Sequence, residues 1–138
     1  MRFLIDTNIL IFILIDKHHI DSNVKHLLSD YNNVFYVSSS SIFEALHLFQ
    51  TGRIAPKQKT GDEFLNAIKT VYNLQILHTK TEHFDTFAKL PAVPGHNDPI
   101  DRIIIAQSIT EKIPLISSDS KFKYYKNLDF IYNDKRAK

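Results

Sequence analysis

The stretch His96-Asn-Asp-Pro-Ile-Asp-Arg-Ile-Ile-Ile-Ala-Gln107 combines a helix start with an almost wholly apolar helix body. Pro99 suits the first helical position, where its missing N–H would have had no partner, so Asp98 is predicted to be the N-cap. Asp101 follows three residues later, in the place of the acidic partner of a capping box. Helix capping therefore explains both aspartates, and a functional site at this helix start needs carboxylates from elsewhere in the chain.

Short apolar runs alternate with helical patterns on both sides of this stretch. We expect strands at 2–5, 34–37, 74–77, 114–117 and 128–132, and helices at 9–15, 22–32, 42–52, 62–72, 81–90 and 99–112, with one helical turn at 122–125. Strands that read as continuous apolar runs between helices are typical of a parallel sheet covered on both faces. The predicted fold class is α/β, a three-layer α/β/α sandwich around a mostly parallel sheet of four to five strands.

Length and composition indicate one globular domain. The sequence is 43% hydrophobic and 23% charged, and we predict a single domain over residues 1–132 followed by a polar, basic and mobile tail at 133–138. The chain has no cysteine, which excludes disulfides and thiolate metal sites. The apolar segment 3–15 is too short to span a bilayer and is interrupted by Asp6, so we expect a cytoplasmic protein.

Four carboxylates are predicted to meet at one edge of the sheet. Asp6 and Asp119 each follow a strand, Glu44 lies in the helix after the second strand, and Asp101 lies in the first turn of the helix before the fourth. The C-terminal ends of parallel strands form the edge at which open α/β sheets place their sites. Each acid alone is explained by capping or solvation. Together they would repel one another unless a cation neutralised them.

Oxygen ligands without cysteine point to Mg²⁺ or Mn²⁺. Such an ion, held by carboxylates, can activate water and neutralise phosphoryl oxygens, so phosphodiester hydrolysis needs no protein nucleophile. The net charge is only +2, from 17 basic and 15 acidic residues. With five of the acids committed to a metal, the remaining surface would be distinctly basic, as a nucleic-acid binder requires.

The ordered motifs closely resemble PIN-domain proteins, with the VapC-type toxin branch as the nearest match. Four segments carry the resemblance: Leu4-Ile5-Asp6-Thr7-Asn8-Ile9-Leu10, the isolated Glu44, His96-Asn97-Asp98-Pro99-Ile100-Asp101-Arg102 with Ile105-Ala106-Gln107, and Leu115-Ile116-Ser117-Ser118-Asp119. By position, Asp6, Glu44, Asp101 and Asp119 match the family's catalytic, metal-binding quartet. Asp98 matches an additional acid of this branch, and Thr7, Asn8 and Ser117 match polar residues around the site.

The resemblance implies a Mg²⁺- or Mn²⁺-dependent endoribonuclease of a toxin–antitoxin pair. It also implies an RNA substrate, a small cognate antitoxin and a homodimer. Two alternatives stay open: an RNA-processing or structure-specific nuclease built on the same acids, and a catalytically idle module that binds RNA or antitoxin. Two further questions stay open: whether the site holds one ion or two, and whether Asp98 is a metal ligand or only a helix cap.

Several other features have structural explanations. Ser38–Ser41 lacks a Gly-x-Ser-x-Gly elbow and is predicted to cap a helix. His47 is expected to face a partner or the core, and Arg102 to bind phosphate or antitoxin or to form a surface salt bridge. Seven aromatic residues could stack bases, but we expect core packing for the majority. These are Tyr31, Phe35, Tyr36, Tyr72, Tyr124, Tyr125 and Tyr132.

Overall fold

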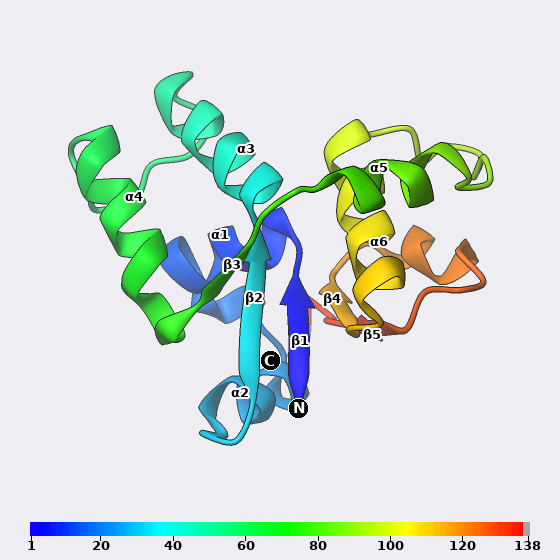
Figure 1. Ribbon diagram of the computed structural model, residues 1–138. Coiled ribbons are helices and arrows are strands. Elements are labelled where there is room, and N and C mark those ends of the chain that lie inside the picture. Colours follow the sequence, from blue (N-terminus) through cyan, green and yellow to red (C-terminus); the bar gives the residue numbers. More distant parts are fainter. Residues whose placement is uncertain (137–138) are drawn as a thin grey trace.

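The computed structural model describes residues 1–136 as a parallel sheet between layers of helices (Figure 1). The strands are β1 (Arg2–Ile5), β2 (Val34–Ser38), β3 (Gln75–Leu77), β4 (Leu115–Ser117) and β5 (Phe130–Tyr132). The α-helices are α1 (Thr7–Ile15), α2 (Ser22–Ser29), α3 (Ser39–Gln50), α4 (Gly61–Thr70), α5 (Thr81–Ala88) and α6 (Pro99–Glu111). Short 3₁₀ turns are η1 (Lys17–His19), η2 (Val71–Asn73) and η3 (Ser120–Tyr124).

The sheet has five strands in the order β3-β2-β1-β4-β5, and every pairing is parallel. In the central strand β1, Ile5 is in register with Val37 of β2 and Ile116 of β4. The C-terminal ends of β1, β2 and β4 therefore meet at the upper edge of the sheet in Figure 1. This arrangement confirms the predicted three-layer α/β/α class.

Alternation along β1 divides its side chains between two apolar cores. Phe3 and Ile5 face a core built with α1, α2, α3 and α4, whereas Leu4 faces a core built mainly with α6. Figure 1 shows α3 and α4 on one side of the sheet and α5 and α6 on the other. The α6 residues Ile103–Ser108 are all buried, which explains why this helix is apolar on nearly all sides.

The predicted helix caps are formed in the structure. Asp98 accepts hydrogen bonds from the N–H groups of Ile100 and Asp101, at 2.9 and 3.0 Å. Ser38 caps α3 through the N–H of Ser40, as the capping interpretation of the serine run predicted. The helix predicted at 62–72 ends earlier, at Thr70, because Tyr72 and Asn73 adopt positive φ angles that interrupt the helix.

The expectation of core packing for most of the seven aromatic residues was wrong. Tyr31, Tyr72, Tyr124 and Tyr132 are exposed, whereas only Phe35 and Tyr125 are buried. The exposed tyrosines lie outside the α-helices or on the last residue of the edge strand β5, where a ring can point to solvent. His47 is also exposed, which excludes a core position for it.

The start of the predicted mobile tail is fastened to the domain. Asn133 is fully buried and hydrogen-bonded to residues far away in the chain, so contacts with the domain extend beyond residue 132. The chemical reason is that its side-chain amide can satisfy backbone groups of other segments. The remainder of that tail after Arg136, which includes Lys138, lies outside the described residues. Within residues 1–136, no helix has the length and hydrophobicity needed to cross a membrane.

Candidate metal centre

Asp6 is held at the junction between β1 and α1. It follows the last residue of β1, and its Oδ1 accepts a hydrogen bond of 2.9 Å from the N–H of Ile9 as the N-cap of α1. Its N–H donates to the carbonyl of Ile116 in the neighbouring strand β4. Asp6 is only 2% exposed, so a strand end, a helix start and the adjacent strand together orient its carboxylate.

Asp119 reaches the same edge because β4 runs parallel to β1. The Ser117 hydroxyl accepts a hydrogen bond of 3.0 Å from the Asp119 N–H, and Asp119 Oδ1 accepts one of 2.9 Å from the Lys121 N–H. Ser117 is fully buried, and its hydroxyl also contacts the Asp6 carboxyl group and lowers the pKa of Asp6. The predicted supporting residue Ser117 therefore lies between the two aspartates.

The Asp101 carboxylate faces the site instead of completing a capping box. Its Oδ2 lies 3.4 Å from Nε2 of His96, and no hydrogen bond within residues 1–136 connects it to the Asp98 N–H. The capping-box interpretation of Asp101 was therefore wrong. Asp98 caps the helix without this reciprocal bond, through its Oδ1, which accepts from the Ile100 and Asp101 N–H groups. Asp98 is exposed, but its charge acts on both Asp101 and Glu44.

Glu44 approaches from α3, the helix that follows β2. Burial raises the pKa of Glu44, a contact with the Thr7 hydroxyl lowers it, and the charge of Asp98 raises it further. Thr7 is buried beside Asp6, in the first turn of α1. Asn8 is exposed and lies on the wall of a groove that also contains Asp119. The structure thus brings all the sequence-predicted acids and polar residues to one edge of the sheet.

Four acids make up what we call the acidic site: Asp6, Glu44, Asp101 and Asp119. Burial raises the pKa of Asp6 to about 6, and the charges of Asp119 and Glu44 add to the effect. Burial also raises the pKa of Asp101 to about 8, with further contributions from the neighbouring acids. With a pKa of about 8, Asp101 keeps its proton at neutral pH unless a cation displaces it.

A divalent cation fits the residues present. One ligand atom each from His96, Asp101 and Asp119 lies within 4.8 Å of the others. The carboxylate oxygens are the donors that Mg²⁺ and Mn²⁺ prefer, and the imidazole nitrogen would suit a transition metal such as Mn²⁺ better than Mg²⁺. The buried Nε2 of His96 faces the site and has no hydrogen-bond partner within residues 1–136.

The orientation of the His96 ring follows from a chain of hydrogen bonds. Arg102 has only hydrogen-bond donors, and its Nη1 donates a hydrogen bond of 2.9 Å to the Tyr125 hydroxyl. The Tyr125 hydroxyl lies 2.7 Å from Nδ1 of His96, and its own proton is free to point there. In neutral His96 the remaining proton is then on Nε2, directed towards Asp101 and Asp119 at 3.4 and 3.5 Å. In this tautomer Nε2 carries a proton and cannot bind a cation, so we interpret His96 as a residue that faces these carboxylates and not as a ligand.

Burial lowers the pKa of His96, which favours this neutral form. Sequence reasoning missed both His96 and Tyr125 as site residues. His96 begins the stretch that carries the helix start, and its position directly after Gly95 was the available signal. Gly95 has φ +75°, and the His96 N–H bonds to the Val93 carbonyl, so a tight turn delivers the ring to the site. No local pattern indicates that Tyr125 packs against it.

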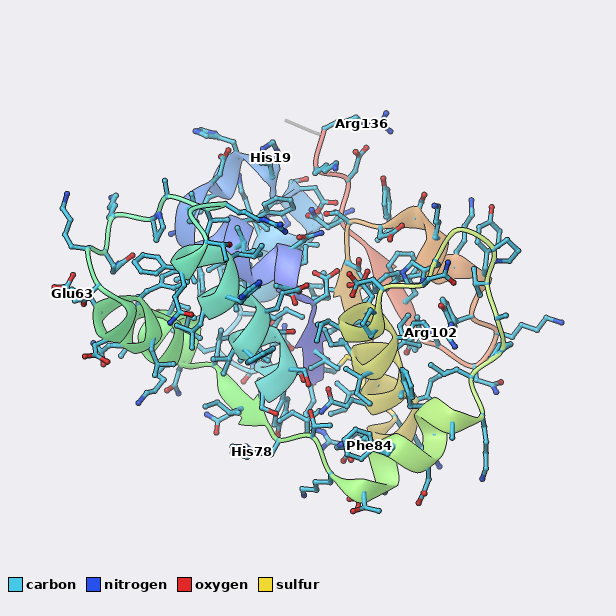
Figure 2. All side chains as sticks on the ribbon, turned by 90° about the horizontal axis from the view of Figure 1, so that it is seen from above. His19, Glu63, His78, Phe84, Arg102 and Arg136 are labelled. Carbon is cyan, nitrogen blue, oxygen red and sulfur yellow. The ribbon has the colours of Figure 1, made fainter. Side chains whose placement is uncertain are left out.

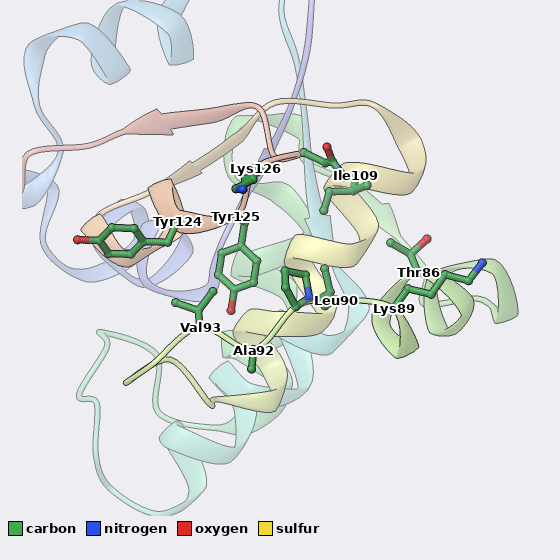
Figure 3. A pocket seen from close by; sticks show the side chains of 11 residues that line it. Thr86, Lys89, Leu90, Ala92, Val93, Ile109, Tyr124, Tyr125 and Lys126 are labelled. Atoms are coloured by element: carbon green, nitrogen blue, oxygen red, sulfur yellow. The ribbon is translucent and has the colours of Figure 1, made fainter.

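Arg102 is committed to this support and to the Pro91 carbonyl, 3.2 Å from its Nη1. It therefore forms none of the expected surface salt bridges within residues 1–136. A pocket of about 590 Å³ is lined by Tyr125, Leu90, Val93 and Ile109, with Lys89 and Lys126 also contributing (Figure 3). None of its lining residues is acidic, so this pocket is separate from the candidate metal centre.

Figure 2 looks down on the upper edge of the sheet in Figure 1, with α3 and α6 on either side. The family model of the PIN domain matches residues 3–128, nearly the whole chain. The chain therefore belongs to the PIN-domain family, whose members are nucleases. No curated protein sequence matches it at a significant level.

Solved structures of similar fold come from bacterial complexes. The chain is similar to a component of VapBC2 from Rickettsia felis bound to a DNA fragment from their promoter, with a TM-score of 0.76, 21% identity and coverage of 97% of this chain and 100% of the other. It also resembles a chain of DNA-bound VapBC from Salmonella typhimurium, with a TM-score of 0.72, 14% identity and coverage of 96% and 98%. A chain of FitAcB from Neisseria gonorrhoeae is also similar, with a TM-score of 0.66, 14% identity and coverage of 99% of each chain.

Proposed function

We propose that this protein is a Mg²⁺- or Mn²⁺-dependent endoribonuclease and the toxin of a cytoplasmic toxin–antitoxin pair. The observation that carries the proposal is the convergence of Asp6, Glu44, Asp101 and Asp119 at the end of three adjacent strands. Burial there raises the pKa values of Asp6, Glu44 and Asp101 in the absence of a cation. Four carboxylates gathered at one place are a poor source of stability and a good source of cation ligands.

The acidic site would hold the ion through Asp6 and Asp101, with Glu44 and Asp119 completing the shell directly or through water. The bound ion supplies an activated water and neutralises charge on the phosphoryl oxygens. The residues of the chain position these ligands: Ile9 and Ser117 contact Asp6, and the His96 ring stands between Asp101 and Asp119. Asp98 serves as the helix cap and adds negative charge to the site.

Replacement of Asp6 or Asp101 by asparagine tests the proposal. Each variant keeps the volume of the side chain and removes a carboxylate, so we expect loss of metal-dependent RNA cleavage with an unchanged circular dichroism spectrum. Asp85→Asn is the matched control, because Asp85 is exposed on α5, away from the acidic site. Cleavage retained in both site variants would refute the assignment.

The antitoxin and homodimer are part of the same proposal. The similar solved structures are named as VapBC and FitAcB assemblies, which supports a small protein partner for this chain. Co-expression with the product of the neighbouring gene should suppress the toxicity of the active protein and yield a stable complex. The mass of the purified protein in solution, measured by light scattering, tests the homodimer, and a monomer at all concentrations would contradict it.

Two other functions compete with this one. A structure-specific or RNA-processing nuclease would use the same acids, and comparison of single-stranded RNA with DNA flaps separates the two activities. An idle binding module would need no cation. A saturable rise of melting temperature with Mn²⁺ favours the enzyme, whereas an idle module would show none.

A further inference from the structure

The segment after β5 is fixed beside the acidic site by a single buried amide. Asn133 Oδ1 accepts a hydrogen bond of 2.8 Å from the Asp21 N–H, and Nδ2 donates to the His19 carbonyl and the Ser118 hydroxyl at 2.8 and 2.7 Å. Its own N–H donates to the Ser117 carbonyl. Ser117 and Ser118 directly precede Asp119, so this amide connects the C-terminal segment to the strand that carries a site carboxylate.

The following residues continue along the same path. The Asp134 N–H donates to Asp21 Oδ2 at 2.8 Å, and the Lys135 carbonyl lies 3.2 Å from Nδ1 of His19. Asp134 Oδ1 accepts from the Arg136 N–H and lies 3.7 Å from Arg136 Nε. The backbone is thus held up to Arg136, while the Lys135 and Arg136 side chains remain exposed. Figure 2 shows Arg136 and His19 near one another at this end of the molecule.

The side chains of Lys135 and Arg136 form one wall of a groove that reaches the acidic site. The groove, which we call the C-terminal groove, has a volume of about 490 Å³, and its lining includes Asn8, Ser118, Asp119, Tyr132, Lys135 and Arg136. Asp119 belongs to both the groove and the acidic site. A chain molecule that lies across the acidic site can therefore continue into the groove without a break.

We propose that the C-terminal groove binds a phosphodiester of single-stranded RNA next to the scissile bond, with Lys135 and Arg136 contacting the phosphate. The inference rests on the proposed function and adds a site to it. The guanidinium of Arg136 can offer two parallel N–H donors to a phosphate, and Lys135 adds a second positive charge. The exposed ring of Tyr132 provides a face on which the attached base can stack.

RNA suits this groove better than an acidic protein segment for two reasons. The groove opens at Asp119, beside the phosphate that is the proposed reactant. The next phosphate of the same RNA strand would then lie near Lys135 and Arg136. The wall also combines cationic groups with an aromatic ring, the combination with which proteins bind single-stranded nucleic acids. A protein carboxylate would match the charges but would leave the ring and the shared Asp119 unexplained.

The test removes the two charges and keeps the acidic site intact. RNA affinity is measured by fluorescence anisotropy at several salt concentrations, in an Asp101→Asn background that prevents cleavage. Lys135→Ala/Arg136→Ala should weaken binding of a short single-stranded RNA about tenfold and reduce the slope of log K against log salt by about 1.4, the value for two lost contacts. Lys57→Ala/Lys59→Ala, which removes the same charge from the loop before α4, is the matched control and should change the affinity less.

Two further comparisons define the site. For cleavage, Asp101 is kept intact. A dinucleotide, which has only the scissile phosphate, should then be cleaved with the same kcat/KM by the wild-type protein and by Lys135→Ala/Arg136→Ala. A longer RNA should be cleaved less efficiently by the double variant. Tyr132→Ala should lose about fivefold or more in RNA affinity, whereas Tyr132→Phe, which keeps the ring, should not. Thermal unfolding confirms that the variants fold.

An unchanged RNA affinity and salt slope in Lys135→Ala/Arg136→Ala would overturn the inference while leaving the proposed function in place. Failure of the wild-type protein to cleave or bind any RNA would overturn both. If the double variant loses binding of a deca-aspartate peptide and still binds RNA normally, the groove is a protein-docking surface and the inference is wrong.

Discussion

The hydroxyl of Tyr125 lies 2.7 Å from Nδ1 of His96, and this contact orients the ring that faces Asp101 and Asp119. Both rings are buried, and they meet edge to face with their centroids 5.4 Å apart. Arg102 completes the chain from the far side of the hydroxyl. The acidic site therefore depends on a residue that contacts none of its four carboxylates.

Tyr125→Phe should weaken metal binding as well as stability. The change leaves Nδ1 of His96 buried without its partner, which costs about 1–3 kcal/mol in the free energy of unfolding. It also releases the ring that orients two proposed ligands, so we expect Mn²⁺ affinity to fall about tenfold or more. Urea unfolding and calorimetric titration measure the two effects. Tyr124→Phe alters the exposed neighbouring ring and should change neither; equal losses in both variants would contradict the role of Tyr125.

The metal-free protein should lose stability as the pH rises from about 4 to about 8. Burial raises the pKa of Asp6 to about 6 and that of Asp101 to about 8, so the folded state binds more protons than the unfolded state across this range. The free energy of unfolding then decreases with increasing pH. For Asp6 alone the loss is on the order of 3 kcal/mol at neutral pH, from a rise of about two pKa units.

Urea unfolding in the presence of a chelator, at pH 5 and pH 8, measures this effect. Asp101→Asn cannot ionise at this position, so its stability should depend less on pH and should exceed that of the wild type at pH 8. Asp85→Asn, on exposed α5, should follow the wild type. Greater wild-type stability at pH 8 than at pH 5 would contradict the raised pKa values.

Divalent cations should raise the melting temperature, and more at pH 8 than at pH 6. Protons on Asp6 and Asp101 compete with the ion, so the ion binds more tightly as they leave. At a concentration of about 100 times Kd, binding adds about 2.7 kcal/mol, which corresponds to about 10 °C for a domain of this size. Differential scanning fluorimetry with Mn²⁺ and Mg²⁺ is sufficient, and an equal shift in Asp6→Asn would show that the ion binds elsewhere.

Asn133→Ala should destabilise the protein although only five residues of the sequence follow this position. It leaves the buried Asp21 N–H and the His19 carbonyl without their partner, which costs on the order of 3 kcal/mol. Asn127→Ala, at an exposed position, is the control and should change the free energy of unfolding by less than about 0.5 kcal/mol. Equal stability of the two variants would show that the C-terminal segment is held only loosely.

Much of the local structure was predictable because its causes are local. Asp98 before Pro99 specifies a helix start through one short hydrogen-bonding pattern, and the apolar run before Asp6 specifies a strand that ends there. Asp101 was misassigned for the same reason. Spacing alone places it in a capping box, but the Asp101 carboxylate points towards His96 and not back to the Asp98 backbone N–H.

The order of strands and helices, the C-terminal edge and the residue types found there were determined by the sequence itself, because periodicity, capping and charge act over a few neighbouring residues. Only the tertiary structure decided which distant groups meet: Tyr125 against His96, and Asn133 against Asp21 and His19. These contacts join segments separated by 29, 112 and 114 residues. Their geometry depends on how the helices pack on the sheet, which no local pattern of residues encodes.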